Sequence, residues 1–229
     1  YKNSGILKPM IRLVYSNVDT SIILLGQMRD QFEDFPKLKL KVVPNVVDEK
    51  FENLTLKFPK KQSILYLSNI MVSKGIVEFL KASKLLLETR KNIQINIAGG
   101  FMGDHLKSKK QVRSVFYRFY EPLKARYPKQ IHFHGIVHGE IKLALLRSSS
   151  LFVLPTYYPT EAFPISILEA MATGNAIITT NHNYLKYIIT SENGSIIPIK
   201  DIKQIVKSVN YFFDNKKKLN QVQINNIKN

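Results

Sequence analysis

The segment that decides the fold runs Leu151-Phe-Val-Leu-Pro-Thr-Tyr-Tyr-Pro-Thr-Glu-Ala-Phe-Pro-Ile-Ser-Ile-Leu-Glu-Ala-Met-Ala-Thr-Gly-Asn-Ala-Ile-Ile-Thr-Thr180. It begins and ends with short apolar runs, at residues 151–154 and 176–180, which predict buried strands. Pro164 and Gly174 frame a helix over residues 164–173, because proline suits the first helical position and glycine the residue after a helix end. Strand, helix and strand in this order predict two parallel strands joined by a crossover helix.

The same alternation extends in both directions from this segment. Further strands are predicted at residues 64–67, 93–97, 131–134 and 195–198, and further helices at 75–88, 108–126, 139–147, 184–189 and after Asp201. Strands that alternate with helices in this way are typical of a doubly wound parallel α/β sheet. We therefore expect a Rossmann-like domain over residues 46–213.

Both ends of the chain differ from this pattern. Residues 1–45 offer two strands, at 22–25 and 39–43, around a short helix, which is too little to bury a core independently. We expect them to be the last piece of a preceding domain and its linker, and the chain to be a fragment of a longer protein. Residues 214–229 are polar and basic, and we expect a frayed tail there.

Composition narrows the class of partner. The chain has 34 Lys and Arg against 17 Asp and Glu, a net charge of +17, and 45% of its residues are hydrophobic. A surplus of this size favours an anionic partner, which is nucleic acid, an acidic membrane surface or a phosphorylated small molecule. The aromatic and basic stretch around residues 112–123 has the apolar spacing of a buried helix face, so we expect no nucleic-acid partner.

The sequence contains no signal for export or membrane insertion. No apolar run approaches the roughly 18 residues that cross a bilayer, and no charged segment followed by an apolar one opens the chain. Cys is absent, which excludes disulfides and thiolate metal sites. We expect a cytoplasmic protein, with peripheral attachment to an anionic inner membrane face as an extension of that expectation.

Ligands of an open parallel sheet bind beyond the carboxyl ends of its strands, so the loops there are the candidate site. Lys74 lies in the loop after residues 64–67, where a helix start and a lysine together favour phosphate; the alternative is an ordinary surface lysine. Gly100 lies in a glycine-rich loop, which either lets a backbone approach a ligand or makes a tight turn. Ile136, Val137 and His138 form a segment that either lies along a flat base or is an ordinary turn.

Two carboxylates flank the N-terminus of the helix predicted at residues 164–173. Glu161 lies in the loop before it and Glu169 lies inside it, while the first amides, at Ile165, Ser166 and Ile167, can hold phosphate. A diphosphate in the middle with hydroxyls at each end is how a nucleotide sugar would fit, because carboxylates accept hydrogen bonds from vicinal hydroxyls. The alternative is a mostly buried helix in which Glu169 is one stray acid.

These residues resemble a known family. Glu161, Glu169 and the following Ala-Met-Ala-Thr-Gly174 are similar to the signature of retaining GT-B glycosyltransferases of the glycosyltransferase family 4 type. The resemblance continues in consistent order from Val43-Pro-Asn-Val-Val-Asp48 to Asn193-Gly-Ser-Ile-Ile-Pro198. It implies the donor-binding C-terminal half of a GT-B fold.

The resemblance also implies roles for individual residues. Lys74 would bind the donor diphosphate, Glu161 would hold the transferred sugar, and Glu169 would bind the ribose hydroxyls, with Lys74 and Glu161 as the catalytic pair. The remaining donor contacts that it implies are Asn69, Gly100, Ile136, Val137, His138, Ala162, Phe163, Pro164, Ile165 and Ser166. No metal or other cofactor is expected.

By the same resemblance, the protein transfers a hexosyl residue with retention from a nucleoside-diphosphate sugar, with UDP favoured, to a glycan or lipid-linked acceptor. The usual proposal is attack on the face from which the diphosphate departs, helped by positive charge and amides at the leaving group. A double displacement with Glu161 as nucleophile is the minority alternative.

Other functions fit the sequence less well. The family has Gly-Arg where this chain has Ser68-Asn69, and this departure supports a rival hypothesis, a non-catalytic module that binds a nucleotide sugar or an anion. His132, His134 and His138 are expected to be ordinary polar or base-lining residues rather than metal ligands. The G-x-S-x-G of hydrolases and the G-x-G-x-x-G of dehydrogenases are absent.

Overall fold

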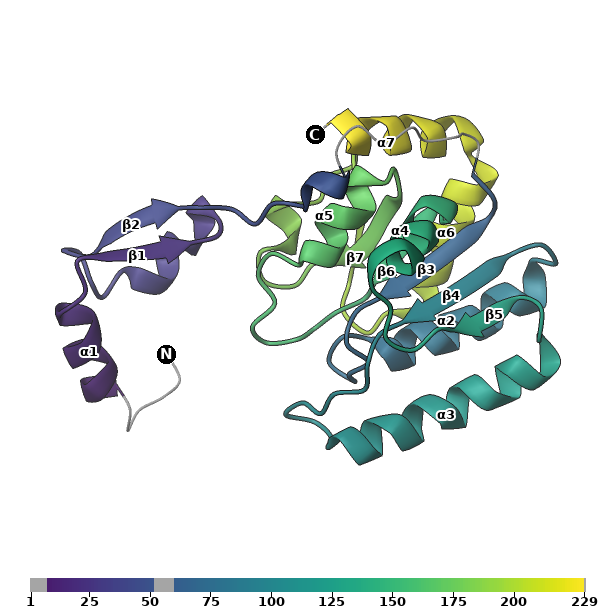
Figure 1. The fold of residues 1–229 in the computed structure, drawn as a ribbon, viewed down its shortest axis with the longest axis horizontal. Coiled ribbons are helices and arrows are strands. Elements are labelled where there is room, and N and C mark those ends of the chain that lie inside the picture. Colours follow the sequence, from purple (N-terminus) through teal and green to yellow (C-terminus); the bar gives the residue numbers. More distant parts are fainter. Residues whose placement is uncertain (1–7, 52–59, 229) are drawn as a thin grey trace. The chain divides into compact units, whose positions relative to one another are not determined.

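A computed structural model describes residues 8–51 and 60–228 of the chain (Figure 1). The chain divides into two compact units, Tyr1–Val46 and Val47–Asn229. The division falls one residue beyond the end of the expected first segment, and the second unit continues to the C-terminus instead of stopping at residue 213.

The larger unit is built on a six-stranded sheet in the order β5-β4-β3-β6-β7-β8, and every neighbouring pair is parallel. Its strands are β3 (Ser63–Leu67), β4 (Gln94–Ala98), β5 (Ile131–Phe133), β6 (Leu151–Leu154), β7 (Ala176–Thr180) and β8 (Gly194–Ile197). The chain moves outward from β3 to β5, then returns to place β6 on the other side of β3. This is the doubly wound Rossmann order, and the predicted fold class is confirmed.

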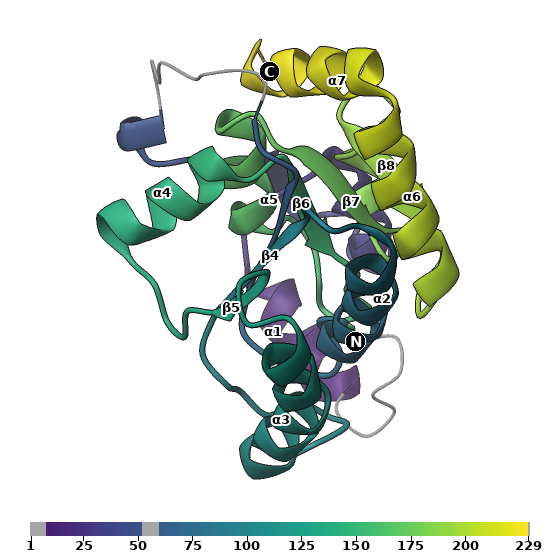
Figure 2. The same cartoon turned by 90° about the vertical axis from the view of Figure 1, so that its right-hand side faces the viewer.

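Helices cover both faces of this sheet (Figure 2). They are α2 (Ile76–Thr89), α3 (Lys109–Arg126), α4 (Gly139–Ser148), α5 (Ile165–Ala172), α6 (Ile202–Asp214) and α7 (Lys216–Lys228). Helix α2 packs against α3 and α6 on one face, and α5 packs against α7 on the other. Every residue of β3, β6 and β7 is buried, because a parallel sheet with helices on both faces exposes neither side.

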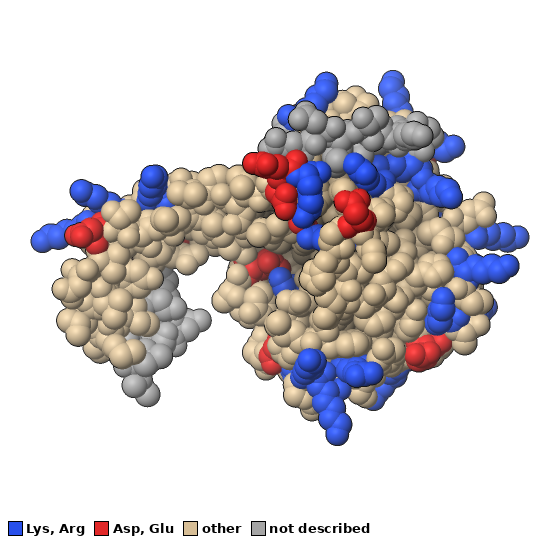
Figure 3. Space-filling model, viewed as in Figure 1, with Lys and Arg blue, Asp and Glu red and all other residues tan. Residues whose placement is uncertain are grey.

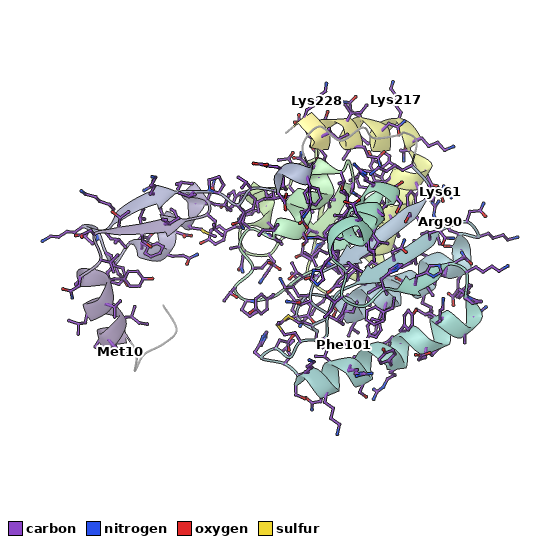
Figure 4. All side chains as sticks on the ribbon, viewed as in Figure 1. Met10, Lys61, Arg90, Phe101, Lys217 and Lys228 are labelled. Carbon is purple, nitrogen blue, oxygen red and sulfur yellow. The ribbon has the colours of Figure 1, made fainter. Side chains whose placement is uncertain are left out.

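The C-terminal segment corrects one expectation. Residues 216–228 form helix α7 rather than a frayed tail, since Leu219 and Val222 are buried against the domain while Lys217 and Lys228 extend outward (Figure 4). The polar side chain of Asn226 is buried as well, and it donates hydrogen bonds to the carbonyls of Asn175 at 2.6 Å and Asn193 at 2.9 Å. The polar composition of this segment did not predict a helix, because the hydrogen bonds of the Asn226 amide that hold the helix in place depend on distant carbonyls.

A second difference is smaller. The helix predicted at residues 184–189 is a single 3-10 turn, η3 (Leu185–Tyr187), and Asn183 before it has a positive φ of 47°. A short 3-10 turn between β7 and β8 suffices because Leu185 and Ile189 are already buried there.

The smaller unit contains helix α1 (Lys8–Ser16), strand β1 (Thr20–Ile23), 3-10 helix η1 (Gly26–Phe32) and strand β2 (Lys39–Val42). The two strands are parallel, with Thr20 paired to Lys39. Its buried apolar residues among those described are few: Ile23, Met28 and Leu38. The sequence predicted the two strands and the short helix between them, but not α1.

Candidate functional site

The candidate site lies where the sheet reverses direction. Strands β3 and β6 are neighbours, but the chain leaves them toward opposite edges of the sheet, so the loops at their carboxyl ends lie at the switch point where such sheets bind ligands. These loops are residues 68–75 and 155–164, and they carry Lys74 and Glu161. A parallel sheet of this order therefore brings together two residues that are far apart in sequence.

Lys74 and Glu161 form a buried ion pair. The Nζ atom of Lys74 lies 2.6 Å from Oε2 of Glu161, with side-chain exposures of 14% and 7%. The hydroxyl of Thr156 donates to the same carboxylate oxygen at 3.0 Å, and the ring of Tyr158 lies 4.9 Å from the ammonium. Each charge is stabilised by the other, so removing one partner leaves an uncompensated buried charge.

Backbone contacts hold the two loops against each other. The amide of Tyr157 donates to the carbonyl of Ser73 at 2.7 Å. Gly75 has a φ of +77°, and a Cβ atom there would lie 2.1 Å from the carbonyl oxygen of Pro155. Only glycine permits this approach, so the position of Lys74 beside Glu161 depends on the residue that follows it.

The start of α5 offers amides at the same edge of the sheet. Pro164 is the N-cap of this helix rather than its first residue, with φ −65° and ψ 120°, and it makes no side-chain cap. The amide of Ile167 donates to the carbonyl of Pro164 at 3.1 Å. The predicted set of three open amides is therefore reduced to those of Ile165 and Ser166, which precede the hydrogen-bond ladder of the helix.

Glu169 is buried on α5, with 6% of the residue exposed. Its Oε1 accepts a hydrogen bond at 2.5 Å from Nζ of Lys142, which belongs to helix α4. Its Oε2 is buried and has no hydrogen-bond partner among the described residues. The alternative in which Glu169 is an unpaired stray acid is wrong, because the charge has a partner, Lys142, that no local pattern indicated.

The loops after β4 and β5 form the neighbouring wall. A Cβ atom on Gly100 would lie 3.0 Å from the side chain of Ile136, so these two loops are in close contact. Ile136 is exposed, Val137 is half-buried, and His138 is the exposed N-cap of α4. The Asn69 side-chain amide lies 3.7 Å from Sδ of Met102 on the loop after β4.

Two further predicted residues, Ala162 and Phe163, are half-buried between Glu161 and the helix start. The side-chain amide of Asn183 donates to the carbonyl of Glu161 at 3.0 Å and to that of Pro159 at 2.8 Å. Asn183 thus fixes the loop from the β7 side. No pattern in the sequence singled out Asn183.

Burial and hydrogen bonding shift the pKa values of three side chains at this edge of the sheet. Burial raises the pKa of Tyr66 well above its ordinary value, with a further contribution from the negative charge of Glu161. Burial also raises the pKa of Tyr157, helped by Glu78 and Asp104. Burial alone would raise the pKa of Asp104, but hydrogen bonds from Ser73, Leu106 and Lys107 outweigh it and the pKa lies below the ordinary value.

The histidines do not form a metal-ligand set. Nε2 of His134 lies 2.9 Å from Oδ1 of Asn96, and Nε2 of His132 lies 3.2 Å from the carbonyl of Lys129. In the part of the chain that the structure describes, no three His, Cys, Asp or Glu residues gather as metal ligands would. Within the same residues, no helix has the length and apolar character needed to span a membrane.

Two curated sequences are similar to this chain over most of its length. An uncharacterized glycosyltransferase of Methanocaldococcus jannaschii is 29% identical over 175 residues, 70% of this chain and 41% of the relative. The lipopolysaccharide core biosynthesis mannosyltransferase LpsB of Rhizobium meliloti is 27% identical over 172 residues, 74% of this chain and 46% of the relative. The chain thus spans less than half the length of either protein.

Solved structures share the fold. TarM of Staphylococcus aureus, as a variant in complex with fondaparinux, α-GlcNAc-glycerol and UDP, superposes with a TM-score of 0.75 at 16% identity, covering 96% of this chain and 42% of that one. The C-terminal domain of a glycosyl transferase group 1 protein (LpcC) of Francisella tularensis superposes with a TM-score of 0.61 at 22% identity, covering 74% and 84%.

A family match covers the whole of the larger unit. Residues 47–229 match the family described as Glycosyl transferases group 1, which is well over half of the chain. The sheet order and the fold of the two solved structures agree with this match. The chain belongs to the glycosyl transferases group 1 family, the retaining GT-B glycosyltransferases of family 4, and its larger unit has the fold of their C-terminal domain.

Proposed function

We propose that this chain carries the donor site of a retaining glycosyltransferase that takes a hexosyl residue from a nucleoside-diphosphate sugar, with UDP favoured. The observation that carries the proposal is the buried pair of Lys74 and Glu161 at the switch point of the sheet, 2.6 Å apart. In this role Lys74 and the amides of Ile165 and Ser166 stabilise the departing diphosphate. Glu161 holds the transferred sugar.

Glu169 binds the ribose in this proposal. Its Oε2 is buried and unpaired among the described residues, and a ribose hydroxyl would supply the hydrogen bond that it lacks. Ile136, Val137 and His138 line the base, and the half-buried Ala162, Phe163 and Pro164 lie beside the sugar. Gly100 and Asn69 complete the donor pocket. No bound metal takes part, because Lys74 and the helix start supply the positive charge at the leaving group.

The acceptor is proposed to be a glycan or a lipid-linked sugar at the cytoplasmic face of a membrane. Two relatives support this class by their names: the Rhizobium meliloti protein already described, and an alpha-galactosylglucosyldiacylglycerol synthase of Streptococcus pneumoniae, which is 23% identical over 90% of this chain and 60% of its own length. Lys and Arg outnumber Asp and Glu over the visible surface (Figure 3), which suits an anionic lipid surface. Residues 1–45 are the end of the acceptor-binding domain in this proposal.

The test is nucleotide binding by this chain. UDP, GDP, ADP and their glucose conjugates are added singly while the unfolding midpoint is recorded. A ligand at 100 times its dissociation constant adds about 2.7 kcal/mol of stability, which moves the midpoint by several degrees. We expect one base class to shift the midpoint, and Glu169→Ala to abolish that shift while Asp214→Ala, on the exposed side of α6, leaves it intact.

A second candidate is a module that binds the nucleotide sugar or another anion without turning it over. The observation that favours it is Asn69, because the family that the sequence resembles usually has an arginine at this position. Binding without sugar transfer supports this candidate over the enzyme. No shift with any nucleotide contradicts the donor site itself.

A further inference from the structure

The partner of Glu169 was not expected from the sequence. Nζ of Lys142 lies 2.5 Å from Oε1 of Glu169, and the two side chains are 25% and 7% exposed. Oε2 of the same carboxylate is buried without a hydrogen-bond partner among the described residues. One carboxylate oxygen is therefore bonded to a cation, and the other is buried and unpaired among the described residues.

This division has an energetic reason. A carboxylate that is almost fully buried is costly unless a cation or several donors compensate it. Within the described residues, Lys142 is the one ammonium bonded to Glu169. Lys50 is close enough to feel the charge of Glu169, but its own bond is to Asp48 at 2.9 Å. Lys142 thus compensates the buried carboxylate of Glu169 and fixes which way that carboxylate faces.

The position of Lys142 connects two walls of the site. It lies on α4, which begins at Gly139, directly after the loop of Ile136, Val137 and His138. Glu169 lies on α5, whose first amides are those of Ile165 and Ser166. The ion pair therefore joins the helix that follows the base loop to the helix that begins at the phosphate site.

Resting on the proposed function, we propose that Lys142 is a positioning residue for the nucleotide: it occupies Oε1 of Glu169 and leaves Oε2 as the oxygen that accepts the ribose hydroxyls. A hydrogen bond from a hydroxyl to an ionised carboxylate is roughly twice as strong as one to a neutral group. Binding does not require the ion pair to break, because the two partners of Glu169 use different oxygens. Lys142 acts through Glu169 and need not touch the ligand.

The test compares each nucleotide with an analogue that lacks the ribose hydroxyls. Calorimetry measures the dissociation constants of UDP, GDP and ADP and of their 2′,3′-dideoxy forms, for the wild type and for Lys142→Met. We expect the wild type to prefer one ribonucleotide over its dideoxy form. We expect Lys142→Met to weaken that ribonucleotide about ten-fold and to leave the dideoxy form within about two-fold.

Three controls separate positioning from other effects. Lys50→Met removes a neighbouring cation that does not bond to Glu169, and we expect no change in the preference. In a Glu169→Gln background, Lys142→Met should change binding less than about two-fold, because its route through the carboxylate is already lost. Lys142→Gln repeats the comparison with a polar side chain, in case methionine impairs folding, which the unfolding midpoint reports.

The outcomes are distinct. Equal losses for the ribo and dideoxy forms, or equal losses with and without Glu169, show that Lys142 acts on the ligand by itself or through the fold, and they overturn the inference alone. A wild type that binds none of the three nucleotides, or does not distinguish ribo from dideoxy forms, overturns the proposed ribose role and this inference with it.

Discussion

One carboxylate oxygen of Asp104 accepts two hydrogen bonds from Ser73, one from its amide at 2.8 Å and one from its hydroxyl at 2.6 Å. The other oxygen accepts the amides of Leu106 and Lys107, each at 2.9 Å. Ser73 is fully buried and directly precedes Lys74. The loop after β4 thereby anchors the loop after β3 at the residue next to the candidate phosphate-binding lysine.

Asp104→Asn is therefore expected to weaken nucleotide binding although Asp104 is not itself a proposed ligand contact. An amide side chain cannot accept all four hydrogen bonds, and losing one or two costs about 1–3 kcal/mol. We expect UDP, or whichever nucleotide binds, to bind three- to ten-fold more weakly by calorimetry. Asp214→Asn, in an exposed ion pair with Arg90, should leave affinity unchanged. Equal affinity for Asp104→Asn and wild type contradicts the anchoring role.

The same carboxylate predicts an acid dependence of stability. The pKa of Asp104 in the folded protein lies below its ordinary value of 3.8, because the four donors favour the charged form over the effect of burial. Its contribution is therefore fully present above pH 3.8 and is lost as the pH falls through the folded pKa. Urea unfolding should show the stability difference between wild type and Asp104→Asn shrinking as the pH drops below 3.8. A difference that grows there contradicts the sign.

Asn69→Arg is expected to tighten nucleoside diphosphate binding. Asn69 is exposed at the carboxyl end of β3, and a guanidinium there adds a cation suited to phosphate oxygens. We expect UDP to bind about five- to ten-fold more tightly, with uridine unchanged, in the same calorimetric assay. Gln221→Arg, on the exposed side of α7, controls for net charge. A gain for uridine equal to that for UDP contradicts a phosphate contact.

Asn226→Ala should destabilise the larger unit by about 1–3 kcal/mol, because the buried carbonyl of Asn175 loses its donor and that of Asn193 keeps only the amide of Ile177. The Asn193 side chain also loses its acceptor on Asn226 at 2.9 Å. Urea unfolding measures the loss. Gln221→Ala is the control on the same helix, since Gln221 is exposed and bonds only to the nearby Asn225 among the described residues. Equal stability of the two variants contradicts a structural role for α7.

Much of the fold could be predicted because local residue patterns indicate most of its strands and helices. The runs at β3, β6 and β7 are mostly apolar, and Pro164 and Gly174 bracket α5 to within a residue or two. Such patterns do not depend on distant partners. Glu161 and Lys74 could be singled out in the same way, from their places after strand ends.

What the sequence did not reveal depends on contacts between distant segments. Lys142 and Glu169 are 27 residues apart and belong to different helices, so nothing local pairs them. Helix α7 was missed because buried amides such as Asn226 look like solvent-exposed positions until the carbonyls that they bond are known. Thr156 beside Glu161 was likewise invisible, since its hydroxyl matters only through the carboxylate it reaches.

The two lysine–glutamate pairs also determine how this site responds to salt. Lys74 with Glu161, and Lys142 with Glu169, sum to no net charge, so these four side chains together exert little long-range attraction on an anionic nucleotide. The long-range attraction comes instead from the +17 surplus spread over the rest of the chain, which ions screen over about 8–10 Å. In the proposed function, ionic strength therefore acts mainly on how quickly a nucleotide arrives, and contacts with the two buried pairs determine how long it stays.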